Sequence, residues 1–202
     1  MSADANVGAH AAPLADEEAE RADLYALLAR LFYAPPDGKL LALLAHAGGG
    51  SEGSVGAAWR ELVAAAGRAQ PEPLREEYET LFVGTGKAPV SLYSTGYTLR
   101  YASESPLAEL RGTLAAIGIA RRHEVHEPED HIAALCDAMR FLIVEKRAPL
   151  AAQQQFFERW MAPVAEKLCD AIDVMPSTGF YRAVGRLAKE FFDIEHRAFE
   201  ML

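Results

Sequence analysis

The sequence offers little that would support a disulfide-stabilised or membrane-inserted protein. It has only two cysteines, Cys136 and Cys169, among 202 residues. Two cysteines so far apart form neither a disulfide framework nor a Cys-x-x-Cys metal motif, and both fall among apolar neighbours in predicted helices, where we expect them to be buried. No run of about 18 apolar residues exists to span a bilayer. Residues 1–13 lack the basic and apolar regions of a signal peptide. The sequence therefore predicts a cytoplasmic protein without membrane insertion.

An excess of positive charge is also missing. The chain has 20 Lys and Arg against 29 Asp and Glu, a net charge of -9. Such a surface repels phosphate backbones and anionic lipids, which argues against nucleic-acid partners. It would steer a cationic partner toward the protein. The alternative is that the acidic balance only keeps the protein soluble.

Residues that would indicate an enzyme are scarce. Neither cysteine has an evident activating neighbour, and no Gly-x-x-x-x-Gly-Lys-Ser/Thr motif is present. The segment Gly84-Thr85-Gly86-Lys87 lacks the spacing and the preceding strand of a phosphate-binding loop. We therefore expect no catalytic residues.

Apolar residues repeat at helical spacing along most of the chain. Leu24, Leu27, Leu28 and Leu31 form such a stripe after Asp16, and Pro35-Pro36 ends the helix. Further helices are expected over residues 39–47, 55–69, 71–82, 105–117, 128–146, 149–174 and 177–201. No segment alternates with period two for long enough to indicate a sheet. The sequence predicts an all-α, single-domain bundle of about eight helices over residues 16–202, after a disordered tail of residues 1–15.

Residues 84–102 differ from the rest of the chain. Glycine and proline interrupt any helix there, while tyrosines recur at positions 93, 97 and 101. A linker of this length inside a compact domain is typically functional or a hinge. An ordered loop whose tyrosines pack on the core is the alternative.

The densest polar cluster reads His-Glu-Val-His-Glu-Pro-Glu-Asp-His over residues 123–131. Pro128 fits the first position of a helix, with Glu127 as its N-cap. Three interpretations stay open. The acids could simply cap the helix. The residues His123, His126 and His131 could bind a metal with a carboxylate. The carboxylates could also accept the guanidinium groups of a basic peptide, in a directional, bidentate pairing.

Several short motifs, taken together and in order, resemble the TorD/DmsD/NarJ-like redox-enzyme maturation chaperones. Residues 127–131 are similar to the family's Glu-Pro-x-Asp-His signature. Residues 78–84 are similar to its Tyr-x-x-Leu-Phe-x-Gly segment, and residues 92–97 to its Leu-Tyr-Glu-Ser-x-Tyr segment. In the last, Ser94 replaces Glu and Thr95 replaces Ser. Residues 156–160 and Pro163 resemble the family's late helix with its Trp and Pro.

The resemblance implies a function. Such chaperones are helical, are not enzymes, and bind a molybdopterin-dependent oxidoreductase through its twin-arginine signal peptide or its apo-protein until the cofactor is inserted. Family members include monomers and domain-swapped homodimers; the resemblance also implies weak binding of guanine nucleotide or a transient contact with the molybdenum cofactor, and no resident cofactor. The client could be a trimethylamine oxide, dimethyl sulfoxide or nitrate reductase, or a formate dehydrogenase. The residues expected to contact it are Glu127, Pro128, Asp130 and His131, with Tyr93 and Tyr97 as secondary candidates.

Two other functions remain open at this point. One is a metal-binding protein built on His123, His126 and His131, which elemental analysis would reveal. The other is a structural subunit that stays in a redox complex.

Overall fold

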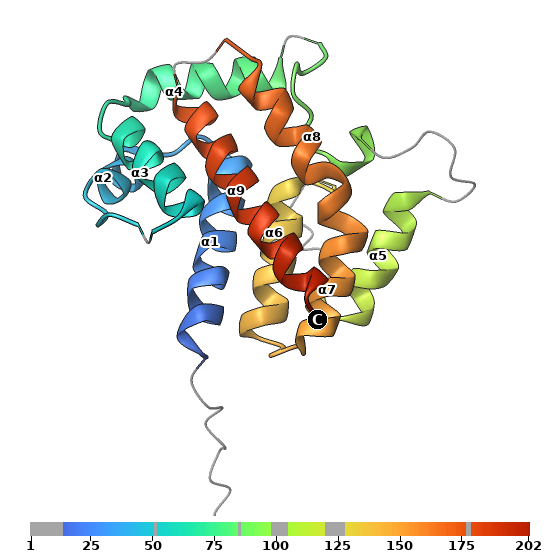
Figure 1. The fold of residues 1–202 in the computed structure, drawn as a ribbon. Helices are drawn as coiled ribbons and strands as arrows, with labels where there is room; N and C mark the ends of the chain where they lie inside the picture. Colours follow the sequence, from blue (N-terminus) through green and yellow to red (C-terminus); the bar gives the residue numbers. More distant parts are fainter. Residues whose placement is uncertain (1–13, 51, 85, 98–104, 120–127, 177–178) are drawn as a thin grey trace, which may run out of the picture.

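The computed structural model describes residues 14–50, 52–84, 86–97, 105–119, 128–176 and 179–202, and it is built from helices (Figure 1). Within these residues there is no β-strand, only one isolated antiparallel bridge between Tyr93 and His131. The predicted all-α fold is therefore confirmed. Most of the predicted tail lies outside the described residues.

Nine α-helices are present in the described part of the chain, and short π-helical segments extend some of them. The helices are α1 (Asp16–Tyr33), α2 (Gly38–Ala45), α3 (Ser54–Ala66), α4 (Pro71–Tyr78), α5 (Pro106–Ala116), α6 (Ile132–Val144), α7 (Leu150–Phe156), α8 (Ala162–Asp173) and α9 (Phe180–Glu200). The π segment η1 (Glu79–Val83) continues α4, and η3 (Phe157–Met161) joins α7 to α8. Because α7, η3 and α8 are continuous, the described chain has eight helical rods, as the sequence predicted.

The long C-terminal helix organises the core. Helix α9 packs against α3 and α8 and also contacts α1, which lies along α6 (Figure 1). Its apolar side is buried, including Val184, Leu187 and Phe191. Aromatic rings near its start form a cluster in which Phe82 packs edge-on against Tyr78 and Tyr181, each with ring centroids 5.1 Å apart. Helix α9 therefore connects helix α3, in the N-terminal half of the chain, with helix α8, in the C-terminal half.

A buried ion pair ties α9 to α1. The Arg21 guanidinium donates two hydrogen bonds to the Glu195 carboxylate, each 2.7 Å long, and the Tyr25 hydroxyl donates a third at 2.8 Å. Glu195 is only 2% exposed. Burial, followed by the charge of Glu195, raises the pKa of Tyr25 well above its usual value, so the hydroxyl stays protonated. The polar groups of Arg21, Tyr25 and Glu195 therefore have hydrogen-bond partners inside the core.

Both cysteines are free and buried, as predicted. Burial raises the pKa of the Cys169 thiol to about 12 and moves that of Cys136 in the same direction. Neither thiol is therefore a ready nucleophile. In the described chain, no helix combines the length and apolar character needed to cross a bilayer.

Candidate functional site

Two of the motifs found in the sequence meet in space. Backbone of residues 92–94 pairs with backbone of residues 130–132: the Ser94 N–H donates to the Asp130 carbonyl at 2.9 Å, and the Ile132 N–H donates to the Leu92 carbonyl at 2.8 Å. These bonds flank the Tyr93–His131 bridge. Segments more than 30 residues apart thus form one small structural unit.

The side chain of Asp130 strengthens this unit. Its carboxylate oxygen Oδ2 accepts hydrogen bonds from the Thr95 hydroxyl at 2.6 Å and from the Thr95 N–H at 3.2 Å. Asp130 is 3% exposed, so these bonds hold the short 3-10 turn η2 (Ser94–Gly96) against the start of α6. One oxygen of the carboxylate expected to meet a client arginine therefore already has a partner inside the protein.

The beginning of α6 corrects one prediction. The sequence indicated Pro128 in the first helical position and Glu127 as N-cap, but the helix starts at Ile132 and its N-cap is His131, whose Nδ1 accepts from the Ala133 N–H at 3.1 Å. Pro128 and the two residues after it form a turn. The reason is the bridge to Tyr93: extended backbone at His131 (φ -64°, ψ 134°) is needed to pair with the neighbouring segment.

Tyr93 and Tyr97 support the unit from two sides. The Tyr93 ring stands edge-on to the His131 ring, with centroids 5.2 Å apart. The Tyr97 hydroxyl donates to the Ser91 carbonyl at 2.8 Å, and the Tyr97 carbonyl accepts from the Lys167 ammonium at 3.3 Å. Burial raises the pKa of Tyr97, so it remains a donor.

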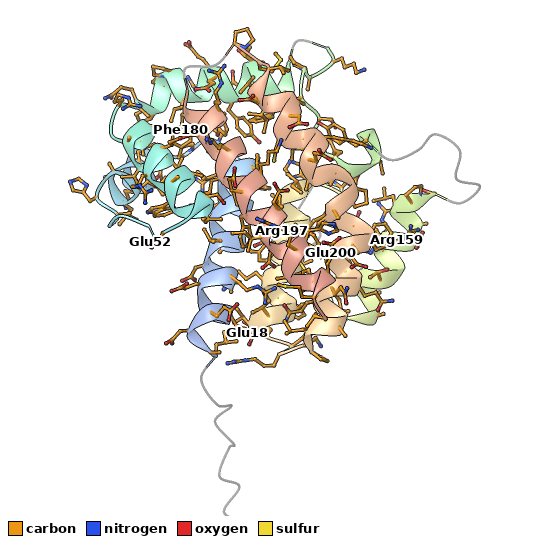
Figure 2. The ribbon with its side chains drawn as sticks, viewed as in Figure 1. Glu18, Glu52, Arg159, Phe180, Arg197 and Glu200 are labelled. Atoms are coloured by element: carbon orange, nitrogen blue, oxygen red, sulfur yellow. The ribbon has the colours of Figure 1, made fainter. Side chains whose placement is uncertain are left out.

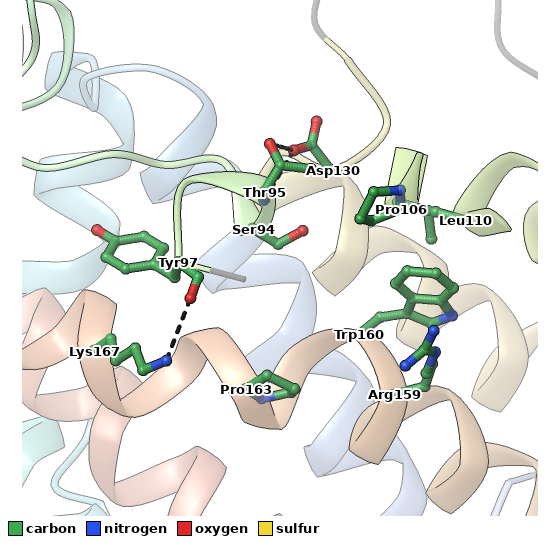
Figure 3. A pocket seen from close by; sticks show the side chains of 10 residues that line it. All are labelled: Ser94, Thr95, Tyr97, Pro106, Leu110, Asp130, Arg159, Trp160, Pro163 and Lys167. Atoms are coloured by element: carbon green, nitrogen blue, oxygen red, sulfur yellow. Dashed lines mark hydrogen bonds between the residues drawn. The ribbon is translucent and has the colours of Figure 1, made fainter. Parts of the chain in front are cut away.

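A cavity of about 330 Å³ opens beside this unit (Figure 3). Four separate parts of the chain line it: Ser94, Thr95 and Tyr97 from the η2 region; Pro106 and Leu110 from α5; Asp130 from the turn; and Arg159, Trp160, Pro163 and Lys167 from η3 and α8. One wall is thus polar, while the wall formed by α5, η3 and α8 combines apolar side chains with the charged Arg159 and Lys167. A cavity of this size can take one or a few side chains of a bound segment.

The apolar wall depends on the π-helical turn η3. A π turn contains more residues than an α turn and is often found at functional sites. Here Phe157 and Met161 stay in the core while Trp160, 7% exposed, reaches the cavity. The Arg159 guanidinium lies over the Trp160 ring, 5.2 Å from its centroid, and pairs with Glu109 of α5.

Helix α5 forms the outer wall and is tied to two of the motif segments. Glu109 accepts from Arg159 Nε at 3.0 Å and from Nη2 at 2.5 Å. Arg111 pairs with Glu129, in the turn before α6, at 3.1 Å. Between them, Leu110 is buried and lines the cavity. Figure 2 labels Arg159 at the flank of the molecule beside α5.

The predicted site residues separate into three groups. Asp130 and Tyr97 line the cavity, while His131 and Tyr93 lie behind it and hold its polar wall. Pro128 is half-buried in the adjoining turn. Glu127 lies outside the described residues, as do His123 and His126 of the suggested metal site. Among the described residues, no group of three or more His, Cys, Asp or Glu side chains is arranged to hold a metal.

Other residues of the cavity were not predicted as site residues. Pro106, Leu110 and Lys167 belong to helix patterns that give no functional signal in the sequence. Arg159, Trp160 and Pro163 did carry a signal, through the late-helix motif. The motif at residues 78–84 is remote from the cavity lining and structural: the Tyr78 hydroxyl donates to the Phe32 carbonyl at 2.9 Å, inside the core.

Comparison with known proteins agrees with the family resemblance of this sequence. A family model described as the nitrate reductase delta subunit matches residues 51–170, more than half of the chain and most of the cavity-lining segments. A TorD chaperone protein of Aliivibrio salmonicida is 29% identical over 136 residues, covering 60% of this chain and 62% of that protein. A protein of Haemophilus influenzae without an assigned function is 27% identical over 117 residues, covering 58% of this chain and 56% of the relative. The matches thus span less than two thirds of either relative.

Proposed function

The chain belongs to the nitrate reductase delta subunit family of TorD-like chaperones, and on this premise we propose that it is a cytoplasmic, non-enzymatic chaperone for a molybdenum-containing oxidoreductase. It would bind the apo-enzyme, or its twin-arginine signal peptide, before the cofactor is inserted. The observation that carries this proposal is the convergence of three motif segments, remote in sequence, on one cavity.

The chemistry of the cavity supports binding of an extended or helical client segment. Trp160, Leu110 and Pro163 offer an apolar surface for a client side chain, and burial of such a chain contributes about 1.5–3 kcal/mol. The polar wall at Thr95 and Asp130 offers hydrogen-bonding groups on the other side. The net charge of -9 would steer a client segment that carries arginines toward the protein.

Release requires that the chaperone bind the apo-client more tightly than the mature one. A ligand shifts an equilibrium only through its different affinity for two states. We propose that cofactor insertion orders the client so that its segment leaves the cavity, after which the export signal is accessible.

Affinity capture from the native host, with the intact chain as bait, tests the proposal. We expect a molybdenum enzyme without its cofactor to be retained, and its signal peptide or apo-form to bind in calorimetry. Trp160→Leu should weaken this binding at least about tenfold, since a buried aromatic anchor contributes 1.4 kcal/mol or more.

Trp59→Leu is the matched control, because Trp59 is the only other tryptophan in the sequence. It lies on α3, a different helix, and donates to the Gly48 carbonyl. If the two variants bound the client with equal affinity, the proposal that the cavity binds the client would be wrong. Recovery of a mature, cofactor-loaded enzyme at fixed stoichiometry would instead indicate a stable subunit of a redox complex.

A further inference from the structure

Arg159 covers the aromatic wall of the cavity. Its guanidinium lies 5.2 Å from the centroid of the Trp160 ring, the range in which a cation and an aromatic face attract each other. Figure 3 shows the two side chains next to each other at one side of the cavity. One face of the Trp160 ring is therefore occupied by a side chain of the protein itself.

Helix α5 holds Arg159 in this position. Glu109 accepts from both Nε and Nη2 of Arg159, a bidentate arrangement that fixes the plane of the guanidinium. One residue along, Leu110 is buried at the cavity, and the next residue, Arg111, pairs with Glu129. Helix α5 is thus tied on either side of Leu110 to segments that line or flank the cavity.

The ion pair that holds Arg159 over Trp160 is weak enough to break and form again. Arg159 and Glu109 have side chains that are 59% and 44% exposed, and an ion pair at this exposure contributes little to stability. The cover over Trp160 can therefore be displaced at a low free-energy cost, whereas the hydrogen bonds from Thr95 to the buried Asp130 carboxylate keep the other wall in place.

We propose that the Glu109–Arg159 pair is a self-occupying latch: in the free protein Arg159 fills the place on Trp160 that an apolar client side chain takes in the complex. The inference concerns regulation of the cavity and rests on the proposed function for the identity of the incoming group. A client side chain displaces Arg159 only if its packing on the indole is more favourable than the contacts of Arg159. The latch therefore selects for segments whose side chain packs well there.

Fluorescence of Trp160 tests the latch without a client. In a Trp59→Phe background, Trp160 is the only tryptophan, and its accessibility is measured by quenching with acrylamide, a neutral probe that does not respond to changes of charge. Glu109→Gln removes the charge that fixes Arg159. We expect the quenching constant to rise about 2- to 5-fold, the factor by which loss of an exposed ion pair changes an equilibrium constant. Arg159→Gln, which removes the cover itself, should raise it at least as much.

Glu72→Gln is the matched control, because Glu72 pairs with Arg75 at 2.6 Å on the exposed side of α4 and the change in charge is the same. Its quenching constant should equal that of the Trp59→Phe parent. Unchanged quenching in both Glu109→Gln and Arg159→Gln would overturn the latch. Increased quenching in a protein that captures no molybdenum enzyme would leave the latch standing and reject the proposed function instead.

Discussion

Asp130 and Thr95 form the contact on which the candidate site depends most directly. From the sequence, Thr95 is a replacement for the serine usual in this family, and the structure gives its hydroxyl a specific role as donor to the Asp130 carboxylate. Serine has the same hydroxyl, so this replacement conserves the contact. Ser94, which stands where glutamate is usual, makes its contact to Asp130 through the backbone N–H, which every residue except proline supplies.

Thr95→Val should destabilise the protein by about 1–2 kcal/mol, because the Asp130 carboxylate, which is 3% exposed, loses one hydrogen-bond donor. Urea unfolding monitored by circular dichroism measures the change. Thr113→Val is the control: the Thr113 hydroxyl only donates to the Glu109 carbonyl of its own helix at 3.2 Å, so the change should stay within about 0.5 kcal/mol. Equal losses in the two variants would show that the contact is not important for stability.

At the scale of helices, the charges that matter most lie inside the bundle. Most ion pairs of the described chain join exposed side chains, as in Lys189–Asp170, whereas Arg21 and Glu195 are 14% and 3% exposed. A buried pair does not necessarily stabilise a fold relative to apolar residues, but loss of one partner leaves an uncompensated charge. The α1–α9 contact is therefore sensitive to single substitutions.

Glu195→Gln should lower the free energy of unfolding by about 3 kcal/mol, since Arg21 and Tyr25 lose a shared acceptor charge in the core. Glu200→Gln, one turn further along α9 and exposed, should change it by no more than about 0.5 kcal/mol. Chemical denaturation of both variants at neutral pH gives the comparison. A loss below about 1 kcal/mol for Glu195→Gln would contradict the importance of the buried pair.

At the scale of the whole molecule, burial of both thiols makes stability depend on alkaline pH. The pKa of Cys169 rises from its usual value near 9 to about 12, and that of Cys136 also rises, because the charged thiolate is disfavoured in the core. In the unfolded chain the thiols lose their protons near pH 9, while in the native protein they keep them. The native state then binds more protons, so stability falls as the pH rises from about 9 toward 12.

The free energy of unfolding should therefore drop by about 2–3 kcal/mol from the two thiols between about pH 8 and about pH 10, measured by urea unfolding in the presence of a reductant. The Cys136→Ala, Cys169→Ala double variant starts from a lower stability, but it should lose less than half as much over the same interval. An identical pH dependence of the two proteins would contradict the assignment to the cysteines.

The sequence by itself determined the helical rods and the location of the motifs. Apolar spacing and proline pairs act over a few residues, which is why the predicted and observed helices agree closely except at the start of α6, and why both cysteines were correctly placed in the core. The order of the motifs likewise indicated the family that the comparisons confirm. Helix positions depend on residues close together in the sequence, and the order of the motifs is visible in the sequence itself.

The tertiary structure decided how the motifs combine. Helix α6 begins four residues later than the capping pattern predicted, because backbone groups at residues 92–94 pair with residues 130–132, and a backbone hydrogen bond carries no signature of its distant partner. For the same reason, the motif predicted a contact between Asp130 and a client arginine but could not predict its hydrogen bonds with Thr95. Only packing of α5 against η3 brings Glu109 to Arg159 and Trp160, and this long-range contact creates both the cavity and its cover.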